Sequence, residues 1–167
     1  MTATAPPPLG PERPVWPYAI GAVSIAMACL GLLELVGLML QIAMAFVLGG
    51  GGMAGLRGLF GPTSGWQVVM LAHHAFRPML SAVLLVGGLM LFKHNRSGPL
   101  LHWIYAVPSV LLAVAYPIAY ILTYPPQLRP QMLLWPIWQA TQSAVYPVFV
   151  MVWFRRARIR EQTSTWA

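Results

Sequence analysis

Four long apolar segments, separated by short polar or glycine-rich stretches, make up most of the chain. They cover residues 18–48, 68–92, 100–124 and 132–154. A helix needs about 20 residues to cross roughly 30 Å of hydrocarbon at about 1.5 Å per residue, so each segment is long enough to cross a membrane. The pattern predicts an all-α integral membrane protein in which residues 18–154 form an antiparallel four-transmembrane-helix bundle.

The segments between and beyond these helices are polar or rich in proline and glycine. Residues 1–17 contain many prolines and predict a disordered cytoplasmic tail. Residues 49–65 are glycine-rich, and such a flexible backbone is not expected within lipid. The connections 93–98 and 125–130 are so short that they join antiparallel neighbours, and residues 155–167 predict a basic cytoplasmic tail.

Composition supports a membrane environment more strongly than the apolar segments alone. Hydrophobic residues make up 58% of the chain and charged residues only 8%, whereas about a quarter of the residues in a soluble domain are charged. The mean hydropathy is +0.67. The lipid bilayer is therefore the expected partner of most of the surface, and other membrane subunits or a second copy of the chain are possible further partners. The net charge of +7 lies mainly beside apolar segments, so no nucleic-acid partner is expected.

The distribution of lysine and arginine predicts the orientation of the four helices. Four crossings put both termini and the 93–98 connection on one side, with Arg13, Lys93, Arg96 and the terminal run Arg155, Arg156, Arg158 and Arg160. Arg57 and Arg129 fall on the other side, with Arg77 near its edge. Basic residues favour the cytoplasmic side, so we expect both termini to be cytoplasmic, in a bacterial inner (plasma) membrane. The terminal run is interpreted as a cytoplasmic anchor, or alternatively as a docking or anionic-lipid patch.

Two charged residues lie deep within the predicted helices, at nearly equal depth. Glu34 is about 25 Å from the cytoplasmic face if hydrocarbon begins near Pro17, and Arg77 is about 22 Å from the same face, counting back from Phe92. A lone carboxylate in hydrocarbon is costly unless it is protonated, paired or hydrated. We therefore expect a buried ion pair between Glu34 and Arg77.

Other polar side chains fall near the same depth in the third and fourth segments. By the same rise per residue, Tyr116, Gln139 and Gln142 lie at about 24, 22 and 18 Å. Together with Glu34 and Arg77 they predict a buried polar layer in the outer half of the membrane. Three interpretations remain open: a clamp that fixes helix order, a functional ion, proton or substrate site, and an Arg77 that extends outward to headgroups beside a protonated Glu34.

The histidines do not form a cofactor site. His73 and His74 are predicted at the outer interface, whereas His102 and His94 lie near the cytoplasmic face, so no bis-histidine haem pair exists at one depth. Adjacent histidines project about 100° apart on a helix and do not both face one metal ion. We expect no metal and no cofactor, although one histidine ligating a pigment or metal shared with a partner remains an alternative. Residues 63–77 either lie along the interface or belong to one helix kinked at Pro78.

Two resemblances follow from these patterns. The ending YPVFVMVWFRRARIR and the turn KHNRSGPLLHWIYAV resemble a loose class of small bacterial four-helix membrane proteins without assigned activity, over about residues 80–160. The chain also resembles the small multidrug resistance transporters, which have four helices and a membrane-embedded glutamate in the first helix that exchanges protons for cationic drugs. Glu34 is the position that matches. The chain departs from that family in its length, its glycine-rich first connection and the presence of Arg77.

The sequence therefore leaves two classes of function, and no catalytic residue is assigned. The first is a non-enzymatic accessory or assembly subunit, which predicts a sealed polar layer with no sizeable cavity. The second is a small proton- or ion-coupled transporter using Glu34, which predicts a water-accessible cavity reaching that carboxylate. We expect the protein not to be an enzyme, because the sequence contains no nucleophile–base pair, no metal box and no phosphate-binding loop.

Overall fold

The computed structural model describes residues 14–48, 65–123 and 134–166. These ranges contain nearly all of the four apolar segments. The predictions for the proline-rich tail up to residue 13, for the glycine-rich connection and for the connection around residues 125–130 lie outside the described residues.

The described chain is helical throughout, which confirms the all-α class. Its five elements are α1 (Trp16–Leu48), α3 (Gly65–Phe92), α4 (Ser97–Thr123), α6 (Leu134–Arg155) and α7 (Ala157–Ser164). The four long helices coincide with the four apolar segments to within three residues at each end. The basic terminal segment contains the short helix α7.

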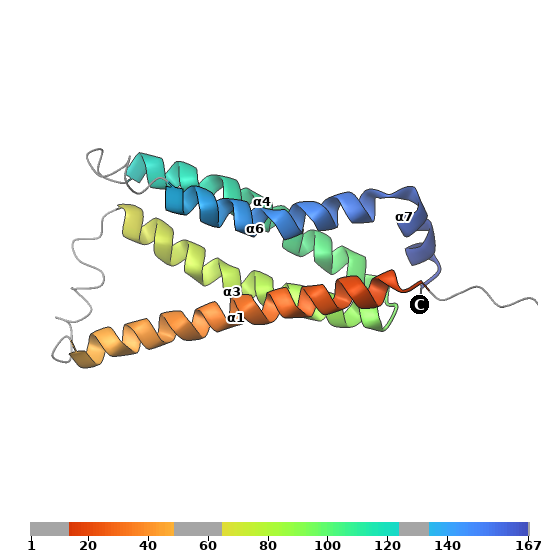
Figure 1. Ribbon diagram of the computed structural model, residues 1–167, viewed down its shortest axis with the longest axis horizontal. Coiled ribbons are helices and arrows are strands. Elements are labelled where there is room, and N and C mark those ends of the chain that lie inside the picture. The colour runs from red at the N-terminus through yellow and green to blue at the C-terminus, as the bar shows by residue number, and fades with distance from the viewer. Residues whose placement is uncertain (1–13, 49–64, 124–133, 167) are drawn as a thin grey trace, which may run out of the picture.

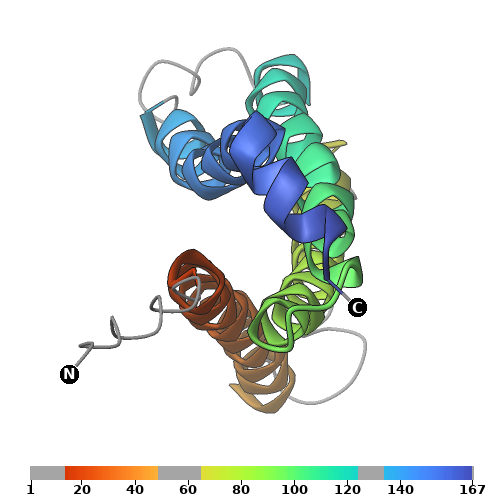
Figure 2. The ribbon, with the colours of Figure 1, turned by 90° about the vertical axis from the view of Figure 1, so that its right-hand side faces the viewer.

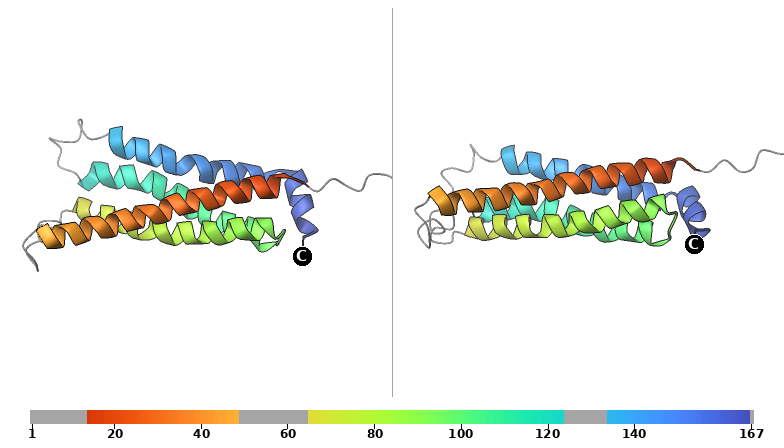
Figure 3. Two further views of the ribbon diagram at one scale, coloured as in Figure 1. Left: turned by 60° about the horizontal axis from the view of Figure 1, so that its bottom comes forward. Right: turned by 90° about the horizontal axis from the view of Figure 1, so that it is seen from below.

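Each long helix runs antiparallel to the one before it and packs against it (Figure 1). Seen from one end, the four helices form an arc in the order α1, α3, α4, α6, with α1 and α6 at its two ends (Figure 2). Helix α7 lies across the end of the molecule where α1 begins and α6 finishes, as the views from below also show (Figure 3).

Within the described ranges, three stretches are long and apolar enough to cross a membrane: Trp16–Met44, Ala72–Phe92 and Ser97–Thr123. Helix α6 is not one of them. Its first half carries Gln139, Thr141, Gln142 and Ser143, which lower its hydropathy. The structure thus supports an integral membrane protein with three apolar helices, and the fourth crossing remains a prediction.

Helix α3 is continuous from Gly65 to Phe92 with Pro78 inside it. The segment from Gly65 onward is therefore helical without a break, whereas its place at the interface or in the membrane and the kink at Pro78 stay predictions. Proline lacks a backbone donor, and in membrane helices neighbouring groups satisfy the carbonyl that it frees.

Helices α1 and α3 approach closely where two glycines meet. A Cβ atom added at Gly21 would be 3.0 Å from the carbonyl oxygen of Gly88, and one added at Gly88 would be 2.9 Å from the carbonyl oxygen of Gly21. From Gly21 onward, the described buried residues of α1 are small and recur at spacings of three and four: Gly21, Ser24, Ala28 and Gly31. Small side chains let two membrane helices approach closely enough for backbone contact.

The end of the molecule that carries α7 is closed by aromatic contacts. The Trp16 ring stacks on Trp166 with centroids 5.4 Å apart and also contacts Phe154 at 6.0 Å. Trp16 Nε1 donates a hydrogen bond of 2.8 Å to Gln162 Oε1, and the Arg96 guanidinium donates one of 3.0 Å to the Ser164 carbonyl oxygen. These contacts tie α7 to α1 and to the turn between α3 and α4.

Among the described residues, α1 and α6 are farther apart at the opposite end of the molecule. Helix α1 diverges from α6 toward that end (Figure 1). Beyond Gly31, none of the α1 side chains that the structure describes is buried. The four helices are therefore packed together at one end only, and the seam between α1 and α6 widens toward the other.

The glycine contact predicts a position-specific loss of stability. Gly21→Leu places a side chain against the α3 backbone, and such overpacking costs about 1–3 kcal/mol or more. Gly37→Leu is the matched control on the same helix, because nothing lies within 4 Å of a Cβ atom added there. Thermal unfolding in detergent is expected to show a lower Tm for Gly21→Leu and little change for Gly37→Leu. Equal Tm values would contradict the α1–α3 contact.

Candidate functional site

Glu34 of α1 and Arg77 of α3 form the ion pair expected from their depths. The distance between Arg77 Nη1 and Glu34 Oε2 is 2.7 Å. The pair is not buried by the protein, because 25% of the Arg77 side chain and 44% of the Glu34 side chain are exposed. Helix α6 stands away from α1 at this level, which leaves part of the carboxylate uncovered by the described residues. Both groups lie within apolar stretches that are long enough to cross a membrane, so burial of the pair by lipid stays a prediction.

The exposed sides of both charged groups face a cavity of about 480 Å³ between α1 and α6. Its polar lining comes from three helices: Glu34 on α1, Arg77 on α3, and Gln139, Gln142 and Ser143 on α6. The apolar lining comes from Met27, Leu30, Gly31 and Val145. The structure thus brings four of the five residues of the predicted polar layer to one cavity.

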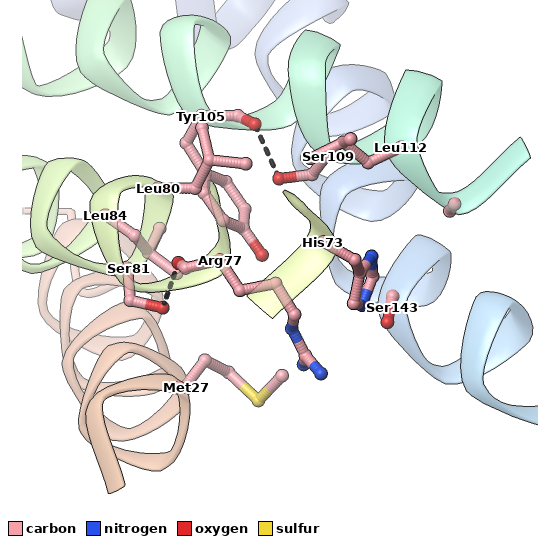
Figure 4. A pocket seen from close by; sticks show the side chains of 12 residues that line it. Met27, His73, Arg77, Leu80, Ser81, Leu84, Tyr105, Ser109, Leu112 and Ser143 are labelled. Carbon is pink, nitrogen blue, oxygen red and sulfur yellow. Dashed lines mark hydrogen bonds between the residues drawn. The ribbon is translucent and has the colours of Figure 1, made fainter. Parts of the chain in front are cut away.

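A smaller cavity of about 60 Å³ lies among α1, α3, α4 and α6 and shares Met27, Gly31, Arg77 and Ser143 with the larger one. Figure 4 shows the Arg77 guanidinium extending from α3 into the space between Met27 and Ser143. Two hydroxyl groups at this cavity donate to carbonyl oxygens of their own helices, Ser81 to Arg77 at 2.9 Å and Ser109 to Tyr105 at 2.7 Å. The lining of this cavity is mainly apolar with a few polar groups, and its volume is large enough for a few water molecules.

Tyr116, the fifth residue of the predicted polar layer, does not line the larger cavity. It is buried, and its ring lies against that of His73 with centroids 4.3 Å apart. His73, expected at the outer interface with His74, is itself buried between α3 and α4 with 6% of its surface exposed. His74 is only partly covered. Adjacent residues project about 100° apart on a helix, so one histidine faces α4 and the other does not.

A second polar cluster, which was not predicted from the sequence, joins α1, α4 and α6 nearer the closed end. Ser24 Oγ lies 2.7 Å from His102 Nε2 and 2.6 Å from the Tyr146 hydroxyl, and all three residues are buried. His102 Nδ1 lies 2.7 Å from the carbonyl oxygen of Gly98. The sequence placed His102 only by its depth, as a histidine near the cytoplasmic face. A buried polar group in an apolar helix requires a hydrogen-bond partner. That requirement was the signal in the sequence from which a contact of Ser24 or His102 could have been expected.

The hydrogen atoms in this cluster can be assigned from the acceptors. The Gly98 carbonyl only accepts, so Nδ1 of His102 carries a hydrogen, and Nε2 is an acceptor in the neutral ring. The single hydroxyl hydrogen of Ser24 is then shared between Nε2 and the Ile20 carbonyl oxygen, which lies 2.7 Å away. The Tyr146 hydroxyl donates to Ser24 Oγ. One serine therefore holds three helices together.

The predicted cytoplasmic anchor lies at the closed end. The four arginines are exposed: Arg155, Arg156, Arg158 and Arg160. The Arg155 guanidinium lies 5.6 Å from the centroid of Trp103, and that of Arg156 lies 4.7 Å from the centroid of Trp153. Arginine over indole at the end of an apolar helix is typical of a membrane–water interface.

Neither cavity brings together a set of metal ligands. Among the described residues there is no group of three or more His, Cys, Asp or Glu side chains that could hold a metal ion. The expectations of no metal and no cofactor stay predictions.

Comparisons of the chain with protein-family models, with curated proteins and with solved structures gave no match. The resemblances to small four-helix membrane proteins and to small multidrug resistance transporters therefore stay predictions. The function has to be inferred from the two cavities and the residues around them.

The Ser24 cluster predicts a coupled loss of stability. Ser24→Ala leaves His102 Nε2 and the Tyr146 hydroxyl buried without this partner, which costs about 1–3 kcal/mol. Tyr146→Phe removes one of these stranded groups, so we expect the double variant to lose less than the sum of the single losses. Denaturant titration of the three variants in detergent measures this coupling. Additive losses would contradict the cluster. Thr141→Ala on the exposed face of α6 is the control, because its hydroxyl only donates to the Ile137 carbonyl oxygen of its own helix.

Proposed function

We propose that this protein is a four-helix membrane protein that binds a small polar solute in the cavity at Glu34 and Arg77 and carries it across the membrane. The observation that carries the proposal is the cavity of about 480 Å³ that reaches both charged side chains. Of the two classes that the sequence left open, only the transporter predicted a sizeable cavity at Glu34. Its volume is in the usual range of small-molecule sites.

The fourth crossing is part of this proposal. Helix α6 runs antiparallel to α4 and returns to the end where α1 begins (Figure 1). Its polar residues Gln139, Gln142 and Ser143 line the cavity, so they need not face lipid. A helix that lines an aqueous cavity crosses a membrane with lower hydropathy than one surrounded by lipid.

The orientation follows from the basic residues. Lys93, Arg96 and the four arginines of the anchor lie at the closed end, which makes that end cytoplasmic by the usual bias of lysine and arginine. The cavity then opens toward the outer face. A bacterial plasma membrane is the location that we propose on the same basis.

Binding and transport fit the polar groups of the cavity better than catalysis does. The Glu34 carboxylate is paired with Arg77, so it is a poor general base, and the two amides are not nucleophiles. A polar pair that faces an open cavity between helices is typical of a solute pathway.

An accessory or assembly subunit is the second candidate function. The outer part of α1 has no buried side chain among those described, and the seam beside it is open, so a helix of another membrane protein fits there. Such a helix would fill the cavity and exclude water from it.

Cysteine labelling tests whether the cavity is filled with water. Cys29 is exposed and is first replaced by serine. Gln142→Cys in that background is expected to react with a membrane-impermeant thiol reagent added outside intact cells. Leu111→Cys is the control, because Leu111 is 63% exposed on α4 without lining either cavity, at a similar depth of roughly 17 Å. An unreactive Gln142→Cys that becomes reactive after purification would support the accessory subunit instead.

The same reagent tests the fourth crossing. Val15 and Ser164 are exposed at the two ends of the described chain. We expect Val15→Cys and Ser164→Cys, again without Cys29, to react only after the cells are permeabilised, because both lie on the cytoplasmic side. Reaction of one of them in intact cells, with the other protected, would show that α6 does not cross.

A further inference from the structure

We propose that the cavity at Glu34 and Arg77 selects zwitterions, that is, molecules carrying an ammonium group and an anionic oxygen group with no net charge. This inference rests on the proposed function and specifies the substrate class of the same site. The feature that carries it is a cation and an anion, 2.7 Å apart, that both line one open cavity.

The charge balance of the site disfavours a simple ion as the ligand. A cation that approaches Glu34 is repelled by Arg77, and an anion that approaches Arg77 is repelled by Glu34, since the two side chains are in direct contact. Neither ion gains a net Coulomb attraction large enough to offset its loss of hydration. Drug-like cations of the kind handled by the small multidrug resistance transporters are disfavoured for the same reason.

A zwitterion satisfies both protein charges at once. Its ammonium group pairs with the Glu34 carboxylate while its anionic group pairs with the Arg77 guanidinium, which gives four alternating charges and two attractive contacts. Both protein side chains are partly exposed, so each can reach a ligand without first leaving the protein interior.

The third wall of the cavity accepts either end of such a ligand. Gln139, Gln142 and Ser143 on α6 supply amide and hydroxyl groups that both donate and accept hydrogen bonds. Gln139 Oε1 is buried and has no hydrogen-bond partner among the residues that the structure describes. This oxygen can therefore accept a hydrogen bond from a donor group of the ligand or from a water molecule.

Two sources supply this chemistry: a free solute such as an amino acid, which enters from the outer face, and the headgroup of a zwitterionic lipid, which enters through the seam between α1 and α6. The recognition groups are the same in both cases. The experiment therefore carries one arm for each source.

The test compares a zwitterion with its two charged halves. Purified protein is titrated with alanine, with ethylamine, which lacks the carboxylate, and with propionate, which lacks the ammonium group. In the lipid arm, protein in nanodiscs of phosphatidylethanolamine is compared with protein in nanodiscs of phosphatidylglycerol, which is anionic. The readouts are the shift in Tm and the slowing of thiol labelling at Gln142→Cys. The apparent affinity of the wild type for one zwitterion is expected to be at least about tenfold higher than for the single-charge probes. This factor corresponds to the loss of one charged hydrogen bond.

Charge variants then test the assignment of each group. Glu34→Gln leaves a lone cation, so its preference is expected to move to propionate, and Arg77→Gln is expected to prefer ethylamine. The double variant Glu34→Gln with Arg77→Gln keeps the site neutral and is expected to lose the zwitterion response. It tests the zwitterion site even where one of the single variants fails to fold. Glu161→Gln and Arg158→Gln are the matched controls, because both residues are exposed on α7 away from the cavity and change the net charge equally.

The inference is overturned if ethylamine or propionate acts as strongly as alanine on the wild type while the two lipids act alike. It is also overturned if neither zwitterion has any effect, or if the double variant keeps the full response. These results differ from failure of the proposed function, in which Gln142→Cys does not react with the impermeant reagent at all.

Discussion

The ion pair between Glu34 and Arg77 is the interaction on which the half of the molecule away from α7 depends. A lone carboxylate or guanidinium within a membrane helix is costly, and each group offsets most of that cost for the other. The pair joins α1 to α3 beyond Gly31, after which the described side chains of α1 are at most half-buried, so it adds a strong contact where packing is weaker. It also leaves both charges partly exposed, so the polar groups that stabilise this region also line the cavity.

The closed end provides the rigidity that the open end lacks. The backbone contact at Gly21 and Gly88, the Ser24 cluster and the aromatic contacts of Trp16 all lie between the pair and the end that carries α7. The four helices are thus joined near α7, and α1 and α6 diverge toward the other end (Figure 1). The cavity lined by the charged pair and the α6 amides lies beyond these contacts, and it is the feature on which the proposed transport rests.

The depth of a residue could be predicted from the sequence, but its surroundings could not. Glu34 and Arg77 were matched across two helices because the rise per residue is constant, and the structure joins them. How much of the pair other helices cover could not be predicted, because it depends on how far α6 stands from α1. His73 and the cluster of Ser24, His102 and Tyr146 escaped prediction because they depend on the rotation of each helix about its axis, which apolar helices surrounded by lipid encode only weakly.

The sequence alone determined the helical class, the positions of the four long helices and the levels at which polar side chains occur. These follow from helix geometry and from the shortage of charged residues, which make lipid the solvent. Only the tertiary structure decided which polar groups meet, that the helices form an arc and that a cavity of about 480 Å³ remains at the charged pair. The physical reason is that lipid solvates an apolar helix equally well on every side, so close contacts between small residues and a few hydrogen bonds select the arrangement.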